Sequence, residues 1–261
     1  MAVILDGKKL AERILAHLAK EIKNSLPADR QGSKKLKLVA VLVEDDPQSK
    51  IFLRQKEKAC QKVGVDFQLC QFPRNISQKL LENEVKKISR NKLCHGIVIQ
   101  LPLPKHIDAG KILNLIPAEK DVDVLSGKKM EAGVVSPVLA GILALLKEYK
   151  ISFQGKKAAV VGRGRLVGQP MIDWLKKHNI EIAEDIKKAD IVIFGVGKPG
   201  FVIKGDMVKK GAVVIDAAGD IEQKSIAKKA SYLTPTPGGV GPMTVAMVIK
   251  NLLILNNVLI N

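Results

Sequence analysis

The sequence has few aromatic residues and few cysteines. Phe, Trp and Tyr make up 3% of the 261 residues while hydrophobic residues make up 46%, so the core must consist of Leu, Ile, Val and Ala. That composition favours buried parallel strands covered by helices. The three cysteines, Cys60, Cys70 and Cys94, are odd in number and widely spaced, which argues against a disulfide framework or a metal site. We expect buried free thiols and no metal.

Acidic residues are outnumbered by basic ones, and the formal net charge is +17. Such a charge suits a nucleic acid, an acidic small molecule or no particular partner. The lysines are spread along the chain, no aromatic residues alternate with them, and no zinc-finger or RNA-recognition signature is present. We therefore expect a solvated basic surface and no specific nucleic-acid partner. A signal-peptide pattern and a bilayer-length apolar run are also lacking, which predicts a cytoplasmic protein with no membrane contact.

Helical and strand-like segments alternate along the chain. In the first half we expect helices at 7–25, 47–63 and 77–88, and strands at 36–43, 67–72 and 96–101. In the second half we expect strands at 157–161, 180–182, 191–196 and 212–217, and helices at 138–149 and 242–255. This alternation predicts an α/β protein with two lobes, each containing a parallel sheet.

A glycine-rich segment follows the expected strand at 157–161. Gly162, Gly164 and Gly168 lie between that strand and a helix. Glycines allow the backbone to approach a phosphate, and the N-terminus of a helix attracts negative charge. The last spacing is one residue longer than in the standard dinucleotide fingerprint, and a plain tight turn is the alternative. The order of strand, glycines and helix favours the dinucleotide interpretation.

Other candidates are polar residues on one helix and at strand ends. Lys56 lies four residues after Phe52, so both share a helix face on which a desolvated lysine could transfer protons. The alternative is a surface charge, because spacing does not distinguish Lys56 from the neighbouring lysines. Gln100 ends an apolar strand, a position at which parallel sheets bind ligands. The alternative is a glutamine that caps the loop backbone. Of Asp121 and Asp123, only one is expected to face a ligand.

Five segments stand together in an order that characterises one enzyme family. They are residues 49–60, 96–104 (Gly-Ile-Val-Ile-Gln-Leu-Pro-Leu-Pro), 120–123 (Lys-Asp-Val-Asp), 195–201 and 234–244. On these motifs the chain resembles the bifunctional methylenetetrahydrofolate dehydrogenase/cyclohydrolase family over nearly its whole length. The resemblance implies oxidation of 5,10-methylenetetrahydrofolate to 5,10-methenyltetrahydrofolate with NADP, and hydrolysis of that product to 10-formyltetrahydrofolate.

The resemblance also assigns roles to single residues. Lys56 matches the catalytic lysine, Gln100 the glutamine that positions it, and Asp123 the aspartate that holds the pterin. The residues expected to contact the folate substrate are Phe52, Pro237, Gly238 and Gly239. The residues expected to contact the cofactor are Gly162, Arg163, Gly164, Arg165, Gly168 and Gly197.

The implied architecture is an N-terminal α/β catalytic domain that binds folate and a Rossmann-like NAD(P)-binding domain. Their expected limits are 1–135 with 240–261 and 136–239, with a folate cleft between the lobes. Family members usually dimerise through the cofactor lobe, so a homodimer is expected. NAD is the alternative cofactor, because Glu184 and Asp185 follow Gly162 at roughly the twenty-residue offset of a ribose-binding acid. Both acids could equally begin the next helix.

The chain departs from the family pattern at several positions. They are Phe52 (usually tyrosine), Val124 (usually glycine), Gly164 (usually serine) and 136–141 (usually Pro-Cys-Thr-Pro-x-Gly). Two stretches are shorter than usual, one after Ile182 and one between Ala218 and Gly219. Most of these departures fall in the cofactor lobe. They leave two alternatives open: an enzyme with one activity, most plausibly cyclohydrolase, or a catalytically silent binding protein with the same fold.

Overall fold

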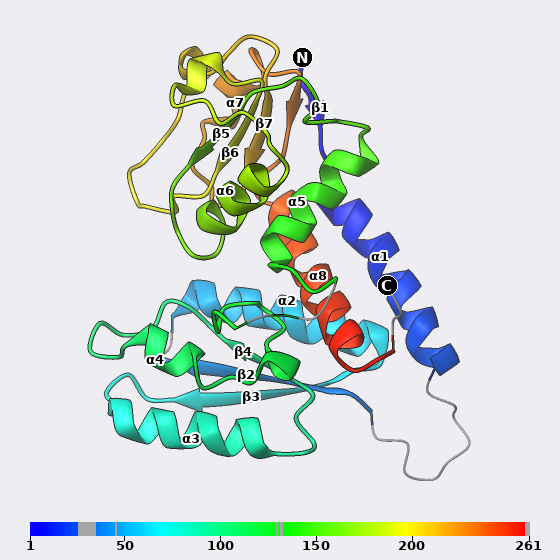
Figure 1. Ribbon diagram of the computed structural model, residues 1–261, viewed down its shortest axis with the longest axis vertical. Helices are drawn as coiled ribbons and strands as arrows, with labels where there is room; N and C mark the ends of the chain where they lie inside the picture. Colours follow the sequence, from blue (N-terminus) through cyan, green and yellow to red (C-terminus); the bar gives the residue numbers. More distant parts are fainter. Residues whose placement is uncertain (26–34, 45, 129, 131–132, 259–261) are drawn as a thin grey trace. The chain divides into compact units, whose positions relative to one another are not determined.

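The chain divides into two compact units (Figure 1). The computed structural model describes residues 1–25, 35–44, 46–128, 130 and 133–258. Unit 1 comprises Met1–Ala11 and Val138–Thr244, and unit 2 comprises Glu12–Pro137 and Val245–Asn261. Helices α1 (Gly7–Ser25) and α8 (Val240–Leu255) each contribute residues to both units. None of the helices that the structure describes combines the length and the apolar character required to cross a bilayer.

Unit 2 is built on a three-stranded parallel sheet of order β3-β2-β4. Its elements are β2 (Lys37–Val43), α2 (Pro47–Val63), β3 (Asp66–Phe72), α3 (Gln78–Arg90), β4 (Gly96–Ile99), α4 (Ala109–Leu113) and the 3-10 turn η1 (Ala118–Lys120). Parallel strands require crossover connections, which α2 and α3 supply. These two helices cover opposite faces of the sheet (Figure 1).

The central strand of unit 2 is buried on both faces. Val39, Val41 and Val43 of β2 pack against Leu81 and Val85 of α3 in one hydrophobic cluster. Side chains alternate between the faces of a strand, so the intervening residues of β2 face the other way, and they are buried as well. The unbroken apolar sequence of this strand therefore reflects helices on both sides of the sheet.

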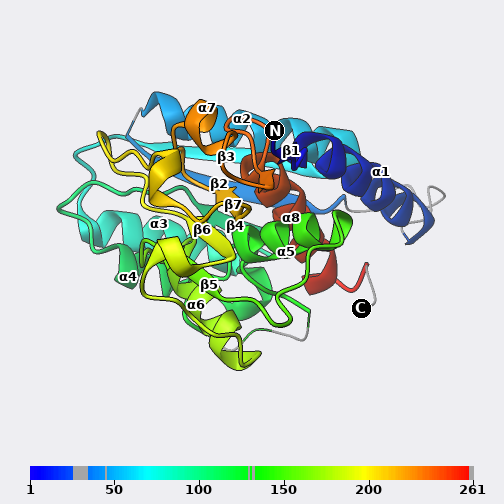
Figure 2. The ribbon, with the colours of Figure 1, turned by 90° about the horizontal axis from the view of Figure 1, so that it is seen from above.

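Unit 1 contains a five-stranded parallel sheet of order β1-β8-β7-β6-β5. Its elements are β1 (Val3–Ile4), α5 (Pro137–Glu148), β5 (Ala158–Val161), α6 (Gly168–Lys177), η2 (Ile186–Lys188), β6 (Ile191–Phe194), η3 (Gly205–Met207), β7 (Val213–Asp216), α7 (Gln223–Ile226) and β8 (Tyr232–Leu233). One face of the sheet packs Phe194 and Val214 against Ile226 of α7. Helix α6 lies on the other face (Figure 2).

The structure confirms most of the predicted elements and corrects three expectations. The strand expected at 180–182 is reduced to a single bridge between Ile182 and Ala158. Strands β1 and β8, each of two residues, were not predicted. Cys60 and Cys94 are buried thiols, whose pKa values burial raises to about 12 and about 11, whereas Cys70 is only partly buried.

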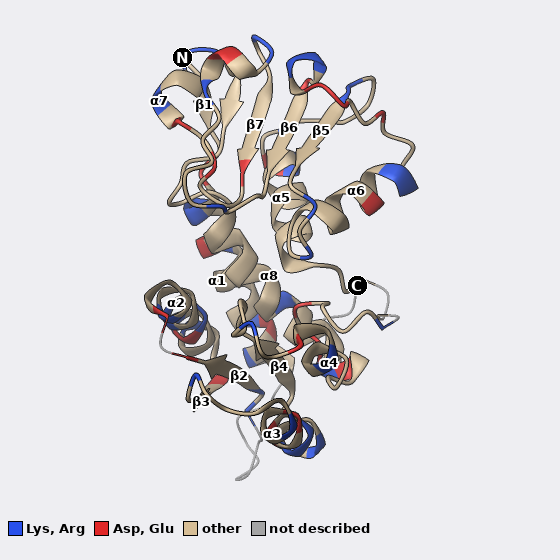
Figure 3. Ribbon diagram, turned by 90° about the vertical axis from the view of Figure 1, so that its left-hand side faces the viewer, with Lys and Arg blue, Asp and Glu red and all other residues tan. Residues whose placement is uncertain are grey.

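The basic residues are spread over both units. Figure 3 shows Lys and Arg on many helices and loops, with Asp and Glu among them. Several lysines are paired with acids, as in the contacts of Lys157 with Glu181 and of Lys209 with Asp190, both 2.6 Å. Exposed pairs of this kind contribute little to stability. Part of the positive charge is therefore balanced by neighbouring acids, and the absence of a specific nucleic-acid partner stays a prediction.

Candidate active site

Helix α2 places one lysine inside unit 2. The helix begins after Asp46, whose carboxylate accepts a hydrogen bond from the N–H of Ser49 at 2.7 Å, and ends at Gly64, where φ is 85°. Asp46 acts as the N-cap, and Gly64 takes the left-handed conformation that a side chain disfavours. Lys56 lies on the apolar face between these ends, and 8% of its surface is exposed. Burial thus distinguishes Lys56 from the exposed Lys58, which the spacing of lysines did not.

Gln100 holds the amine of Lys56. The Nζ atom of Lys56 donates to Oε1 of Gln100 at 3.3 Å, and Nε2 of Gln100 donates to the carbonyl of Leu101 at 2.9 Å. The second bond fixes which end of the amide faces the lysine. Gln100 directly follows β4, at the carboxyl edge of the unit 2 sheet where parallel sheets bind ligands.

The two aspartates of the third motif have different environments. Asp121 is 1% exposed and accepts hydrogen bonds from the N–H groups of Leu125 (3.2 Å) and Ser126 (2.7 Å), so it shapes the turn. Burial raises the pKa of Asp123, the charge of Asp121 raises it further, and the positive charge of Lys56 opposes both. The predicted catalytic residues are therefore brought together: Lys56 bonds Gln100 and interacts electrostatically with Asp123.

Sequence reasoning missed a residue that supports Asp123. Asn251 of α8 is 2% exposed, and its Nδ2 donates to the carbonyl groups of Val122 and Val135, both at 2.9 Å. Asn251 therefore anchors Val122, the residue before Asp123, and also Val135, near the start of α5. Its signal in the sequence was a single amide within the apolar run of the last helix.

The glycine-rich segment of unit 1 fits a dinucleotide phosphate. Gly162 follows β5 with φ of 97°, and a Cβ on it would lie 2.6 Å from the carbonyl oxygen of Gly195. A Cβ on Gly168 would lie 2.1 Å from the carbonyl oxygen of Gly162. Helix α6 begins at Gly168 without a side-chain cap. Gln169 donates its N–H to the carbonyl of Gly164 at 3.0 Å and Pro170 has no N–H, so Gly168 is the position in this first turn whose N–H can meet an anion. Arg163 and Arg165 are exposed beside this segment.

The acids after the expected second strand are less suited to bind a ribose. Asp185 accepts a hydrogen bond from the N–H of Lys187 at 2.9 Å and caps η2, so the interpretation that it begins the next short helix is the one the geometry favours. Glu184 is exposed. Of the two carboxylates that could bind the ribose of NAD, that of Asp185 is therefore already bonded within its own turn, and that of Glu184 is exposed.

The predicted substrate-binding residues fall in different units. Phe52 lies on α2 of unit 2 and is 45% exposed. Pro237, Gly238 and Gly239 precede α8 in unit 1, where Gly238 has φ of 110° and its carbonyl accepts a hydrogen bond from the N–H of Lys8 at 2.8 Å. Their roles toward a folate stay predictions.

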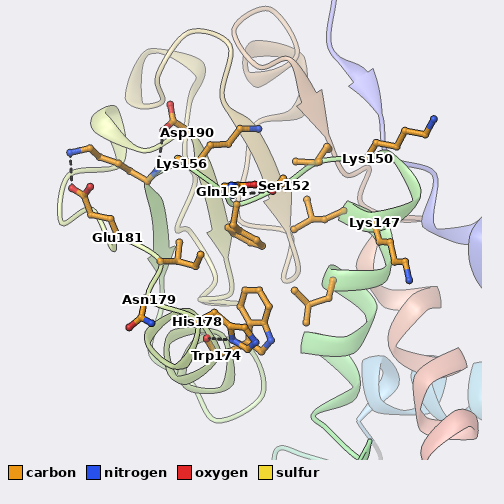
Figure 4. Close-up of a pocket in the computed structure, with 17 residues that line it drawn as sticks. Lys147, Lys150, Ser152, Gln154, Lys156, Trp174, His178, Asn179, Glu181 and Asp190 are labelled. Atoms are coloured by element: carbon orange, nitrogen blue, oxygen red, sulfur yellow. Dashed lines mark hydrogen bonds and ion pairs between the residues drawn. The ribbon is translucent and has the colours of Figure 1, made fainter. Parts of the chain in front are cut away.

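A cavity of about 1000 Å³ in unit 1 lies away from the glycine-rich segment. It is lined by the end of α5, residues 151–157 and the end of α6, near the amino ends of β5 and β6 (Figure 4). Trp174 stacks on His178 at 4.1 Å between ring centres and contacts Phe153 at 5.3 Å. Parallel sheets of this type bind ligands at the carboxyl ends of their strands, so this cavity is not the dinucleotide site.

Comparison with known proteins identifies both halves of the chain. Residues 5–123 match the model of the tetrahydrofolate dehydrogenase/cyclohydrolase catalytic domain, and residues 136–258 match that of the NAD(P)-binding domain of the same family. The bifunctional protein FolD of Nautilia profundicola is 41% identical, with 95% of each chain covered. That alignment spans 276 positions, more than the 261 residues of this chain, so the relative carries insertions.

Solved structures agree with this result. The bifunctional FolD enzyme of Campylobacter jejuni is 31% identical, with a TM-score of 0.87 and coverage of 99% of this chain and 100% of its own. The methylenetetrahydrofolate dehydrogenase-cyclohydrolase of Trypanosoma brucei, solved with NADP and an inhibitor, is 30% identical, with a TM-score of 0.89 and coverage of 98% and 97%. The predicted family and two-domain α/β fold are confirmed.

Proposed function

The chain belongs to the tetrahydrofolate dehydrogenase/cyclohydrolase family, and we propose that it performs two consecutive steps of one-carbon folate metabolism. In the first step a hydride leaves the methylene carbon of 5,10-methylenetetrahydrofolate and is accepted by NADP. In the second step water adds to the cationic 5,10-methenyl carbon, a C–N bond breaks, and 10-formyltetrahydrofolate and a proton are released. The observation that carries this proposal is the buried Lys56, whose amine bonds Gln100 and whose charge acts on Asp123.

Lys56 is the group that moves protons in the hydrolytic step. Water that attacks a cationic carbon must lose a proton, and an amine held at a fixed place accepts or relays it. The bond from Lys56 to Gln100 supports this role because it directs the amine to the carboxyl edge of the sheet. A neutral glutamine orients the amine without adding a negative charge beside it.

Asp123 is the group that holds the pterin. The aminopyrimidine edge of a pterin presents N–H donors, and an aspartate accepts two such bonds side by side. Burial has raised the pKa of Asp123 in the free protein. Donors from a bound pterin would stabilise the charged form, so part of the free energy of binding offsets the cost of burying that carboxylate.

Unit 1 supplies the hydride acceptor. The N–H of Gly168 at the start of α6 and the backbone of Gly162 would bind the phosphates, and Arg163 and Arg165, both exposed, would contact an adenosine 2′-phosphate. The absence of a side chain at Gly162 supports this assignment, because the backbone there can approach a phosphate closely. The approach to Gly195 requires the same glycine for packing of the chain. We propose NADP as the cofactor, the dinucleotide with which the Trypanosoma brucei enzyme was solved. We further propose that the protein acts as a cytoplasmic homodimer.

Two spectrophotometric assays test the function. The first follows the reduced cofactor on mixing 5,10-methylenetetrahydrofolate with NADP, and separately with NAD. The second follows the disappearance of supplied 5,10-methenyltetrahydrofolate without any cofactor. The proposal predicts activity in both. Activity in the second alone would show a protein reduced to a cyclohydrolase, and activity in neither would contradict the proposal. Light scattering on the purified protein would measure its molar mass and so test the homodimer.

A further inference from the structure

Two aspartates of unit 1 are almost completely buried. Asp216, the last residue of β7, is 2% exposed, and Asp220, four residues later, is 1% exposed. A buried carboxylate is costly unless several donors reach it. Among the described residues neither aspartate forms an ion pair with a basic side chain. Both carboxylates therefore depend on neutral hydrogen-bond donors.

Asp216 joins the loop after β7 to the loop after β8. Its Oδ1 accepts hydrogen bonds from three backbone N–H groups, those of Ala218 (3.2 Å), Gly219 (2.8 Å) and Asp220 (3.0 Å). Its Oδ2 accepts one from the hydroxyl of Thr236 at 3.0 Å. The four-residue loop 217–220 is thereby held against the end of its own strand.

Asp220 extends the connection to the loop after β6. Its Oδ2 accepts a hydrogen bond from the N–H of Val196 at 2.6 Å, and its Oδ1 accepts one from the N–H of Gly197 at 2.8 Å. Gly197 has φ of 62°, a conformation that glycine adopts without strain. We call Asp216, Asp220 and the three loops that they join (195–197, 217–220 and 234–236) the aspartate brace.

The aspartate brace lies beside the phosphate-binding segment. Loop 195–197 contacts that segment directly, because Gly195 is the residue that a Cβ on Gly162 would meet. The order of strands reverses at β5, which has Ile182 on one side and β6 on the other. Doubly wound sheets bind a dinucleotide across such a reversal, with one half on each side. The residues around Ile182 belong to the adenosine side, so the aspartate brace belongs to the nicotinamide side.

The loop after β7 has a defined set of groups to offer a ligand. Its N–H groups are used internally, since that of Ala217 bonds the carbonyl of Phe194 at 2.9 Å and the other three bond Asp216. Ala218 and Gly219 are nonetheless exposed. Their carbonyl oxygens are therefore the backbone groups left to accept a bond from a ligand, such as the carboxamide NH₂ of a nicotinamide.

We propose that Asp216 and Asp220 are positioning residues for hydride transfer, which fix the three loops so that the nicotinamide ring is held in a reactive orientation. The inference rests on the proposed dehydrogenase function. Its physical basis is the sensitivity of hydride transfer to placement, since an error of about 1 Å lowers a rate by roughly a hundredfold. Hydrolysis of the methenyl compound needs no cofactor, so loosening loops 195–197 and 217–220 should leave it in place.

The test uses Asp220→Asn. The amide keeps one acceptor oxygen but sets its NH₂ against the N–H of Val196 or Gly197. We expect kcat/KM of the dehydrogenase to fall at least about tenfold, and calorimetry to show weaker NADP binding. Turnover of supplied 5,10-methenyltetrahydrofolate should stay within about twofold. The matched control is Asp190→Asn at the amino end of β6, where the carboxylate also accepts a backbone N–H, that of Lys157 at 2.9 Å. It should change neither activity.

Thr236→Val removes one donor to Asp216 and keeps the shape of the side chain, so it carries the test if Asp220→Asn does not fold. It should lower the dehydrogenase alone, by about threefold, because Asp216 keeps the three backbone donors to its other oxygen. Unchanged dehydrogenase and NADP affinity in a folded variant would overturn the inference. An equal fall of both activities would also overturn it, by showing a merely structural role. A wild-type protein that binds no NADP would instead remove the proposed function, and the inference with it.

Discussion

The functional groups proposed for the two units are of different kinds, side chains in unit 2 and backbone groups in unit 1. In unit 2 the proposed groups are side chains from three separate elements: Lys56 bonds Gln100, and its charge acts on Asp123. In unit 1 they are backbone groups, exposed by Gly162 and Gly168, at which any Cβ would collide with the chain. A side-chain site is lost when one functional group is removed. A backbone site is lost when one methyl group is added, and it tolerates changes of neighbouring side chains.

The largest effect is expected in unit 2, from Lys56→Met. The substitution keeps the length and apolar stem of the side chain and removes the amine, so cyclohydrolase turnover should fall by about 10²- to 10⁴-fold. Folate affinity should change by less than roughly tenfold, about 1.4 kcal/mol. Steady-state turnover and an equilibrium titration measure the two quantities. Lys58→Met, an exposed position on the same helix, is the control. Full activity of Lys56→Met would exclude this lysine from the mechanism.

Unit 1 should respond to the addition of a methyl group. In Gly168→Ala the new Cβ would lie 2.1 Å from the carbonyl of Gly162, so the phosphate-binding segment must shift. We expect NADP binding to weaken about a hundredfold, or roughly 2.7 kcal/mol, by calorimetry. Gly164→Ala is the matched control, since its Cβ would meet nothing within 4 Å; it should bind NADP within about threefold of wild type. Similar losses in both variants would contradict the backbone account.

Discrimination between dinucleotides should be moderate. Arg163 and Arg165 favour the 2′-phosphate of NADP by charge, but both are exposed, and exposed charges are screened by solvent and salt. Asp185 is engaged as a helix cap, so it contributes little repulsion. We therefore expect NAD to bind less tightly than NADP by no more than about a hundredfold. Parallel titrations at one ionic strength measure the ratio, and exclusive, tight NADP binding would contradict this expectation.

A gain of function is expected on α2. Phe52 lies one helical turn before Lys56 and is partly exposed, so Phe52→Tyr places a hydroxyl near the amine without displacing core residues. The phenol adds a donor to the site, and we expect turnover to rise by a few fold. Phe52→Leu controls for the ring itself. An unchanged or lower rate in the tyrosine variant would show that the site is adapted to the phenyl ring.

The smallest effect concerns stability next to the pterin aspartate. Val124 has φ of 58°, in the left-handed region that a β-branched residue rarely adopts. Val124→Gly relieves that strain and should stabilise unit 2 by about 1 kcal/mol, or about 2–4 °C in Tm. Gly127 has φ of 72° with nothing near its Cβ position, so Gly127→Ala should shift Tm in the opposite direction. A lower Tm for Val124→Gly would show that packing of the valine outweighs its backbone strain.

The elements with local signals were predictable. Asp46-Pro47 and Gly64 mark the ends of α2 through capping and the left-handed turn, and the structure places those ends as expected. Strands β1 and β8 were not predictable, because two residues contain no periodicity and pair only through the tertiary fold. The expected strand at 180–182 failed for a related reason: its short apolar run suits a strand, but Ile182 alone reaches the edge of β5.

The candidate site could be proposed from the sequence as a set of residues but not as a geometry. Lys56 and Gln100 are 44 positions apart, and no spacing rule joins them. The resemblance, and not the spacing, selected Lys56 among its neighbouring lysines. Its burial could not be predicted because it depends on how α2 packs. Asp216 shows a signal that was available: it ends an apolar strand, as Gln100 follows one. The same argument applied to every strand end would have found it.

The contrast between the units is tested most directly by one measurement on Gly168→Ala. Its cyclohydrolase turnover is measured with 5,10-methenyltetrahydrofolate supplied and no dinucleotide present. If unit 2 performs hydrolysis with its own side chains, turnover should stay within about threefold of wild type while oxidation of 5,10-methylenetetrahydrofolate falls by about a hundredfold. A parallel loss of both activities, in protein whose Tm shows it to be folded, would contradict the separation of the two reactions between the units.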